Sequence, residues 1–176
     1  MGLAPKTAQH IKRMVRVDQA GEYGAIRIYA GQLAVMGERG PNGAKIREME
    51  AQEADHLDWF NTLAVERGAR PTVLQPIWHV AGFALGAATA LIGPEAAMAC
   101  TAAIETEIDQ HYTQQLEELG EDDPELADKI RRARDDEREH RDAALAAGAE
   151  RAPAYPLLAG AIRLGCRLAI KLSERI

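Results

Sequence analysis

Long stretches that mix apolar and charged residues alternate along this chain with short stretches rich in glycine and proline. The long stretches are rich in Ala, Leu, Glu and Arg, which favour helix, and contain few runs of β-branched residues. The short stretches break this pattern at 37–43, 68–71, 93–95, 120–124 and 152–156. The chain is therefore predicted to form six helices, running from about Thr7 to Met36, Ala44 to Arg67, Gln75 to Ile92, Pro94 to Leu119, 124 to Ala147, and 156 to near the C-terminus.

The third predicted helix, 75–92, is almost uncharged, which raises the question of a membrane span. Its apolar part, from Trp78 to Ile92, is rich in Gly and Ala and is short beside the roughly 20 apolar residues that a span needs. His79 at one end and Pro94-Glu95 at the other limit it further. We therefore expect an interfacial or partly buried helix.

The sixth predicted helix carries a basic stripe, because Arg163, Arg167 and Lys171 recur at every fourth position among leucines and isoleucines. A basic amphipathic helix can lie in a membrane interface with its cations at the headgroups. It can equally pack on a bundle and show its charges to water. The uncharged helix at 75–92 favours the first interpretation, so these three residues are candidate membrane-binding residues.

Length and charge refine this picture. The 176 residues suit one all-α domain spanning 1–176. The net charge is −6, but residues 1–17 and 151–176 each carry +4, which leaves −14 for the middle. An acidic centre suits cation binding, and basic ends suit an anionic membrane surface better than nucleic acid, although ordinary solvated charge gives the same pattern. Cys100 and Cys166 lack metal-binding spacing, and no secretory signal is apparent, so we expect reduced thiols in a cytosolic compartment.

The candidate chemistry lies in a pattern that occurs twice. A lone Glu precedes a Glu-x-x-His pair by 31 residues in the first half and by 32 in the second. Positions i and i+3 of a helix share a face, so each pair can close on one metal ion. Four Glu and two His within a four-helix bundle are the ligands with which ferritin-like proteins hold two iron or manganese ions. The candidate ligands are Glu22, Glu53, His56, Glu105, Glu137 and His140.

Each of these residues taken alone fits a surface salt bridge or an ordinary histidine better, and only their joint arrangement favours a metal site. Asp136 directly precedes Glu137 and could hydrogen-bond a ligand histidine of the opposite pair, or could be one more exposed acid. Tyr112 lies two helical turns after Glu105, on the same face, where it could donate a hydrogen bond near the metals or be an ordinary buried tyrosine.

Several motifs resemble those of the demethoxyubiquinone hydroxylase family, ferritin-like di-iron monooxygenases of ubiquinone biosynthesis. They cover nearly the whole chain and comprise Val-Asp-Gln-Ala-Gly-Glu-Tyr-Gly-Ala at 17–25, Glu-Ala-Asp-His at 53–56, 93–101 with Glu105, His111-Tyr112, Asp-Glu-Arg-Glu-His at 136–140, and 167–175. The resemblance implies the six ligands named above, with Glu53 and Glu137 as bridges. It also implies that His111 and Tyr112 take part in a hydrogen-bonding or electron path.

The resemblance further implies two iron ions per chain, O₂ as co-substrate, and NADH or the quinol itself as reductant; no dinucleotide-binding glycine motif is present. The substrate would be a polyprenyl demethoxyubiquinol. The protein would be peripheral, on the cytoplasmic face of a bacterial membrane or on the matrix side of the inner mitochondrial membrane. A homo-oligomer or a partner protein of ubiquinone biosynthesis is compatible with the sequence, which determines neither.

Two other classes of function remain compatible with the residues alone. An iron store or peroxidase would use the same ligands, although no CxxC pair supplies a rubredoxin module and the apolar helices argue against a soluble cage. A lipid carrier would use the apolar helices and hold metal only structurally.

Overall fold

The computed structural model describes residues 8–176, so the predicted start at Thr7 lies outside the described residues. Within them the chain forms six α-helices and one short 3₁₀ helix, η1. Their bounds are α1 Ala8–Met36, α2 Pro41–Arg67, α3 Gln75–Ile92, α4 Pro94–Leu119, α5 Pro124–Ala146, η1 Ala149–Arg151 and α6 Tyr155–Ser173. The predicted all-α class is confirmed.

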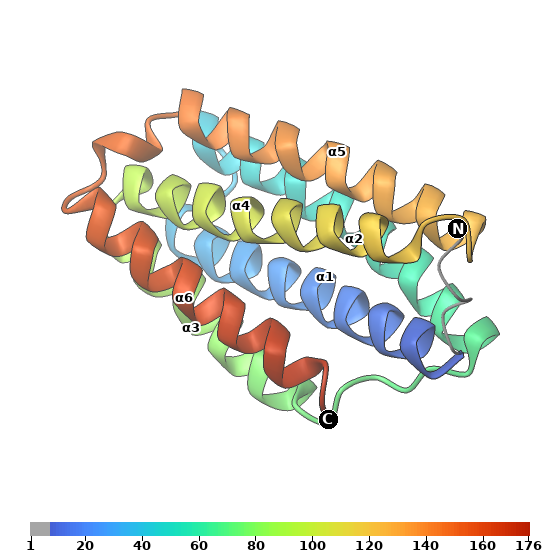
Figure 1. Cartoon of the computed structure of the whole chain (residues 1–176). Helices are drawn as coiled ribbons and strands as arrows, with labels where there is room; N and C mark the ends of the chain where they lie inside the picture. The colour runs from blue at the N-terminus through green and yellow to red at the C-terminus, as the bar shows by residue number, and fades with distance from the viewer. Residues whose placement is uncertain (1–7) are drawn as a thin grey trace.

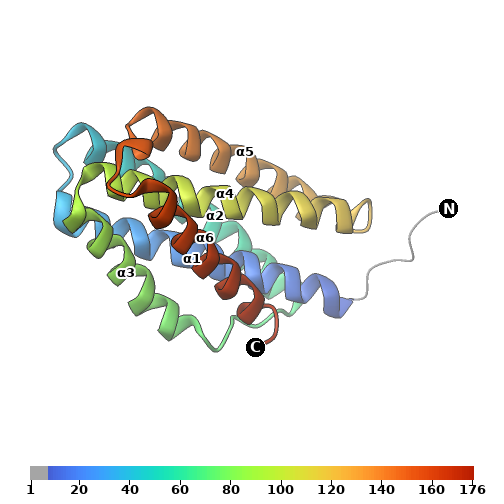
Figure 2. The ribbon, with the colours of Figure 1, turned by 60° about the vertical axis from the view of Figure 1, so that its left-hand side comes forward.

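The helices form a bundle with two helices added along one side. Helices α1 and α2 pack as one pair, α4 and α5 as the other, and the two pairs together make the ferritin-like four-helix bundle (Figure 1). Helix α3 packs mainly on α1, whereas α6 packs mainly on α4 and crosses obliquely over the bundle (Figure 2). The two added helices thus cover the same side of the molecule and leave α2 and α5 on the other.

Local chemistry explains most helix ends. Helices α2 to α6 each have a proline in the first turn, where its missing N–H and fixed φ cost nothing. This explains why α2 begins at Pro41 rather than at the predicted Ala44. Gly68 ends the same helix with a left-handed φ of 62°. Asp123 caps α5 by accepting a hydrogen bond from the Leu126 amide.

The apolar core has two clusters, one toward each end of the bundle, with the acidic residues of the middle between them. One cluster includes Tyr29, Ile46 and Met98, and the other includes Phe60 and Leu126. Small residues let the helices approach closely, and α4 buries alanines at 96, 97, 99, 102 and 103.

Glycine lets α3 touch the backbone of α1. A Cβ atom on Gly31 would lie 2.1 Å from the carbonyl oxygen of Phe83, and one on Gly86 would lie 1.9 Å from that of Ile28. No side chain fits in those gaps, so the two helices meet backbone to backbone. This contact fixes where α3 lies relative to the acidic centre.

Candidate metal centre

Six buried side chains meet inside the bundle, supplied by the four helices of the two pairs. Helices α1 and α4 each give one Glu, and α2 and α5 each give a Glu-x-x-His pair whose members share a helix face. None is more than 3% exposed. The structure therefore brings together all six residues predicted from the sequence, namely Glu22, Glu53, His56, Glu105, Glu137 and His140.

The six residues form two overlapping groups of four. In each group the potential ligand atoms lie within 4.8 Å of one another. Glu53 and Glu137 belong to both groups, His56 and Glu22 to one, and His140 to the other, with Glu105. The two shared carboxylates stand where groups bridging two ions would have to stand.

One nitrogen of each histidine ring faces the carboxylates. His56 Nδ1 lies 3.5 Å from Glu22, 3.4 Å from Glu53 and 3.6 Å from Glu137. His140 Nδ1 lies 3.1 Å from Glu53 and 3.5 Å from Glu137. Three of these five separations reach 3.5 Å or more, which leaves a gap between groups that all point inward.

The other ring nitrogen of each histidine bonds to a side chain of the opposite pair. His56 Nε2 lies 2.9 Å from Asp136 Oδ2, the contact that the sequence suggested for Asp136. His140 Nε2 lies 2.7 Å from Gln52 Oε1. Sequence reasoning missed Gln52, although it directly precedes Glu53 just as Asp136 precedes Glu137.

Two tyrosines secure the carboxylates that belong to one group only. The Tyr112 hydroxyl donates to Glu22, and the Tyr29 hydroxyl donates to Glu105. Both tyrosines are almost fully buried. Tyr29 was also missed, although it follows Glu22 by seven residues as Tyr112 follows Glu105. Comparing the two halves position by position would have found both Tyr29 and Gln52.

The electrostatics of this cluster favour the binding of protons or metal cations. Burial, followed by the neighbouring carboxylates, raises the pKa of Glu22 and of Glu105 well above the usual range. Burial alone would lower the pKa of His140, but the nearby carboxylates of Glu137 and Glu53 outweigh it and raise the pKa to about 9. Without cations, then, the cluster is neutral only if some of its groups take up protons.

The donor atoms fit metal ions better than they fit one another. The buried side-chain oxygens and nitrogens without a hydrogen-bond partner include both oxygens of Glu53 and of Glu137, one oxygen of Glu22 and of Glu105, and Nδ1 of both histidines. Orphaned buried polar atoms are costly and rare. Two divalent cations would satisfy all eight atoms and balance four carboxylates, and oxygen with imidazole donors suits iron or manganese.

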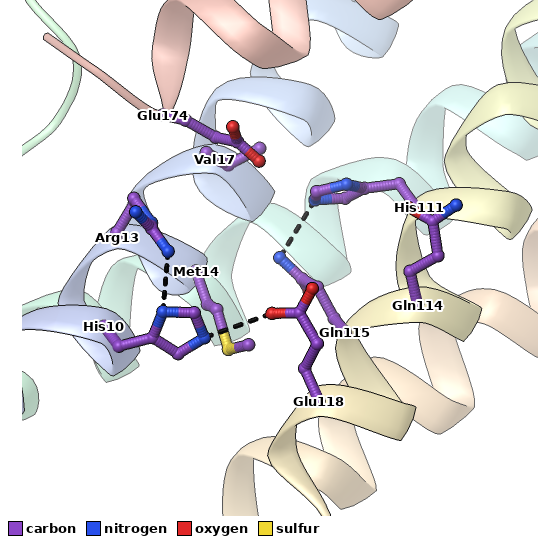
Figure 3. A pocket seen from close by; sticks show the side chains of 9 residues that line it. All are labelled: His10, Arg13, Met14, Val17, His111, Gln114, Gln115, Glu118 and Glu174. Atoms are coloured by element: carbon purple, nitrogen blue, oxygen red, sulfur yellow. Dashed lines mark hydrogen bonds and ion pairs between the residues drawn. The ribbon is translucent and has the colours of Figure 1, made fainter. Parts of the chain in front are cut away.

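His111 lies apart from the six residues, at a small polar pocket of about 50 Å³ shared by the ends of α1, α4 and α6 (Figure 3). Its Nε2 lies 2.9 Å from Gln115 Nε2 and 3.5 Å from Asp18, whose carboxylate is buried. Gln115 also donates to Asp18 at 2.8 Å. His111 is therefore joined to the buried polar interior through Asp18, while its neighbour Tyr112 reaches Glu22.

The basic stripe of α6 has a partner inside the protein. Arg163 Nε lies 2.5 Å and Arg167 Nε 3.2 Å from the Glu107 carboxylate, which is only 3% exposed. These two arginines anchor α6 to α4, the packing role that the sequence left open. Within residues 8–176 Lys171 forms no such ion pair, and its side chain is exposed.

An apolar groove with a volume of about 540 Å³ opens between α1, α3 and α6. Gly21 and Gly24 of α1, on either side of Glu22 in the chain, line its inner wall, and Ile104 and Ile108 of α4 flank Glu105 there. Trp78 and Ser173 lie at its edge, where the indole Nε1 donates to the hydroxyl at 3.1 Å and links α3 to α6.

Nearly the whole described chain matches one protein family, and two named relatives are more than half identical to it. Residues 9–173 match the family described as ubiquinone biosynthesis protein COQ7. The chain is 56% identical over 172 residues to the 3-demethoxyubiquinol 3-hydroxylase of Rhodospirillum rubrum, covering 98% of this chain and 81% of that protein. It is 55% identical over 170 residues to the mitochondrial NADPH-dependent 3-demethoxyubiquinone 3-hydroxylase of Homo sapiens, covering 94% and 78% respectively.

Proposed function

The chain belongs to the COQ7 family of ubiquinone biosynthesis proteins, and on that premise we propose that it is a 3-demethoxyubiquinol 3-hydroxylase with a di-iron centre. Relatives at 55–56% identity carry that name or its ubiquinone equivalent. The observation that supports the di-iron part is the pair of overlapping four-residue groups, in which two carboxylates are common to both. A site for one ion would not need that duplication.

The proposed roles of the six residues follow from their positions. Glu53 and Glu137, which belong to both groups, would hold both ions, whereas Glu22 with His56 would hold one ion and Glu105 with His140 the other. When bound, two iron ions supply the two-electron reduction of O₂ from which one oxygen atom enters the quinol ring. Tyr112 and Tyr29 hold the outer carboxylates by hydrogen bonds, which keeps those ligands oriented inward. The surrounding apolar clusters keep bulk water from the reacting groups.

The apolar groove is the proposed route for the substrate. Its lining is almost entirely aliphatic, and it ends against the parts of α1 and α4 that carry Glu22 and Glu105. A polyprenyl tail could lie between α3 and α6 while the ring approaches the centre. The polar pocket at His111 lies at the end of the bundle, and we propose that Asp18 and Tyr112 connect it to the centre as a hydrogen-bonded path.

We further propose that the side formed by α3 and α6 rests on a membrane. Large apolar side chains are exposed on both helices, among them Ile77, Val80 and Leu91 on α3 and Leu164 and Leu168 on α6. Helix α3 is also long and apolar enough to be considered as a span, but an interfacial position suits its packing on α1. The surface would be the cytoplasmic face in a bacterium or the matrix side of the inner membrane in a mitochondrion.

The hydroxylation also needs a source of electrons. The human relative is named NADPH-dependent. For this chain we propose a reduced nicotinamide such as NADH, or the quinol itself, as the source of the electrons. Consumption of the nicotinamide in step with quinol hydroxylation would support the first source, and turnover without it the second.

The decisive experiment measures metal and product together. The purified protein should hold about two iron ions per chain and convert a demethoxyubiquinol to its hydroxylated product. Glu53→Ala should lose iron and hydroxylation but keep its helical circular dichroism. Glu139→Ala, an exposed Glu beside the site, should change neither. Full activity in the Glu53→Ala protein would contradict the proposal, and iron uptake without product would favour an iron store.

A further inference from the structure

The two halves of the metal centre differ in the groups that hold their histidines. The residue before each ligand pair accepts a hydrogen bond from the opposite histidine, and it is a carboxamide in one half and a carboxylate in the other. Gln52 Oε1 lies 2.7 Å from His140 Nε2, and Asp136 Oδ2 lies 2.9 Å from His56 Nε2. Both histidines are buried, and both direct an unpartnered Nδ1 atom inward.

Both partners fix the same tautomer. An oxygen of a carboxamide or of a carboxylate can only accept, so each histidine donates its Nε2 proton to that oxygen, and Nδ1 is the ring nitrogen left to bind a metal ion. Nδ1 faces buried carboxylate oxygens at 3.1–3.6 Å, where it can bind only a proton or a metal ion. Gln52 therefore does for His140 what Asp136 does for His56.

Gln52 and Asp136 differ in the strength of the hydrogen bond that each accepts. Hydrogen bonds to an ionised acceptor are roughly twice as strong as those between neutral groups. Asp136 thus draws the Nε2 proton of His56 more strongly, and this makes Nδ1 of that ring the better electron donor. Asp136 also adds a negative charge near one ion that the neutral Gln52 does not add near the other.

We propose that Gln52 is a positioning residue of the metal centre, and that the Gln52–Asp136 difference makes the two ion sites unequal. The site of His56, with Glu22, binds a divalent cation more tightly and fills first. The site of His140, with Glu105, fills second. This inference rests on the proposed di-metal function, but it concerns the affinities of the sites and not the reaction.

The test uses cobalt(II) added in steps to metal-free protein. Cobalt strongly shifts the proton NMR signal of the exchangeable Nε2 proton of a histidine that it binds, so each occupied site gives its own signal. One signal should dominate at one equivalent, and the second should grow toward two. The signal that disappears in a His56→Gln variant belongs to the site of His56, and it should be the signal that dominates at one equivalent.

Exchanging the two partners gives the sharpest comparison. The double variant Gln52→Glu/Asp136→Asn keeps the net charge and the total of acceptors, and the order of filling should reverse. Gln52→Leu alone should weaken only the second site, by about 10- to 100-fold. Asp135→Asn, which removes an exposed charge next to Asp136, serves as the control and should leave the order unchanged.

The outcomes separate this inference from the function on which it rests. Equal filling of both sites in the wild type, or an unchanged order in the exchanged variant, would overturn the inequality and leave the di-metal centre intact. If Gln52→Leu bound cobalt at the second site as tightly as the wild type, Gln52 would not be a positioning residue. A wild-type protein that binds no cobalt would overturn the metal centre itself.

Discussion

At the scale of single residues, the metal centre repeats the same contacts in both halves of the chain. The lone Glu of one half accepts from the tyrosine that lies seven residues after the lone Glu of the other half. Each histidine likewise bonds to the residue that precedes the opposite Glu-x-x-His pair. Four of the six inward-pointing groups, namely Glu22, Glu105 and the two histidines, are thus held from behind by a side chain of the other half, so these contacts form only when both halves pack.

Tyr29 should therefore matter for folding as well as for the metals. Changing Tyr29 to Phe removes the hydroxyl that donates to Glu105 and leaves a buried oxygen without that partner, which costs about 1–3 kcal/mol. Urea unfolding of the metal-free protein would measure the loss. Tyr112→Phe should show a loss of similar size, because Tyr112 supports Glu22 in the same way. Tyr155→Phe, at a partly exposed position, should have little effect; equal effects at all three positions would contradict the expectation.

The sequence indicated the inward-facing residues better than their supports. Ligand types and the i to i+3 spacing can be read from one chain, because helix geometry alone brings them to one face. Asp136 and Tyr112 were also singled out, but as open alternatives. Gln52 and Tyr29 were not, because neither residue type by itself indicates a metal site, and each has a signal only as the counterpart of Asp136 or Tyr112 in the other half.

At the scale of elements, the position of α3 depends on glycines rather than on apolar side chains. The helix has only four buried residues, of which two are Gly82 and Gly86. A Cβ atom on Gly82 would lie 3.0 Å from the Cβ of Arg27, so this position is also close to α1. The sequence predicted the bounds of this helix but not its close contact, because glycine in a helix ordinarily indicates only weak propensity.

Replacing Gly86 by Ala tests this contact. The added methyl group would overlap the Ile28 carbonyl, so α3 must move away from α1 at a cost of about 1–3 kcal/mol. The melting temperature, followed by circular dichroism, should fall. Gly160→Ala in α6 is the matched control, because nothing lies within 4 Å of its added Cβ, and alanine should stabilise that helix by about 0.5–1 kcal/mol. A fall of the same size in both variants would show that α3 does not depend on close approach.

The helix ends were also predicted only in part from the sequence. Breakers such as Gly93 and Gly120 predicted where helices stop, because glycine disfavours continuation. The start of α2 at Pro41 lay within a stretch that was expected to be a loop, and η1 was not predicted at all. Both depend on how the chain turns between packed helices, and a turn of a few residues carries little periodic signal.

At the scale of the whole molecule, one side is chemically unlike the rest. Helices α3 and α6 line the groove with their inner faces and carry exposed leucine, isoleucine and valine outward. The sequence suggested this side, and for the basic stripe of α6 it favoured membrane contact over packing on the bundle. The structure shows that Arg163 and Arg167 bind the buried Glu107, so changing them would disturb the packing of α6. A clean test of membrane contact must use other residues.

Leu164 and Leu168 provide that test, since they are 66% and 58% exposed on α6. Burial of each leucine in a membrane interface would contribute about 1.5–3 kcal/mol, so the double change to Gln should sharply reduce sedimentation with lipid vesicles. Melting temperature and cobalt binding should stay as in the wild type, because neither side chain belongs to the core or the metal centre. Turnover of a long-tailed quinol should fall more than that of a short-tailed, water-soluble analogue.

Two further variants separate lipid contact from a general loss of apolar surface. Val65→Gln removes an 83% exposed apolar residue from α2, on the far side of the molecule, and should leave vesicle binding unchanged. Lys171→Gln should weaken binding to anionic vesicles by about 1 kcal/mol and have no effect on neutral ones, because its charge acts only on an anionic surface. If the double leucine variant sedimented like the wild type, the exposed side of α6 would not be the membrane contact. The exposed residues Ile77 and Val80 of α3 would then be the surface to change next, since α3 forms the other wall of the groove.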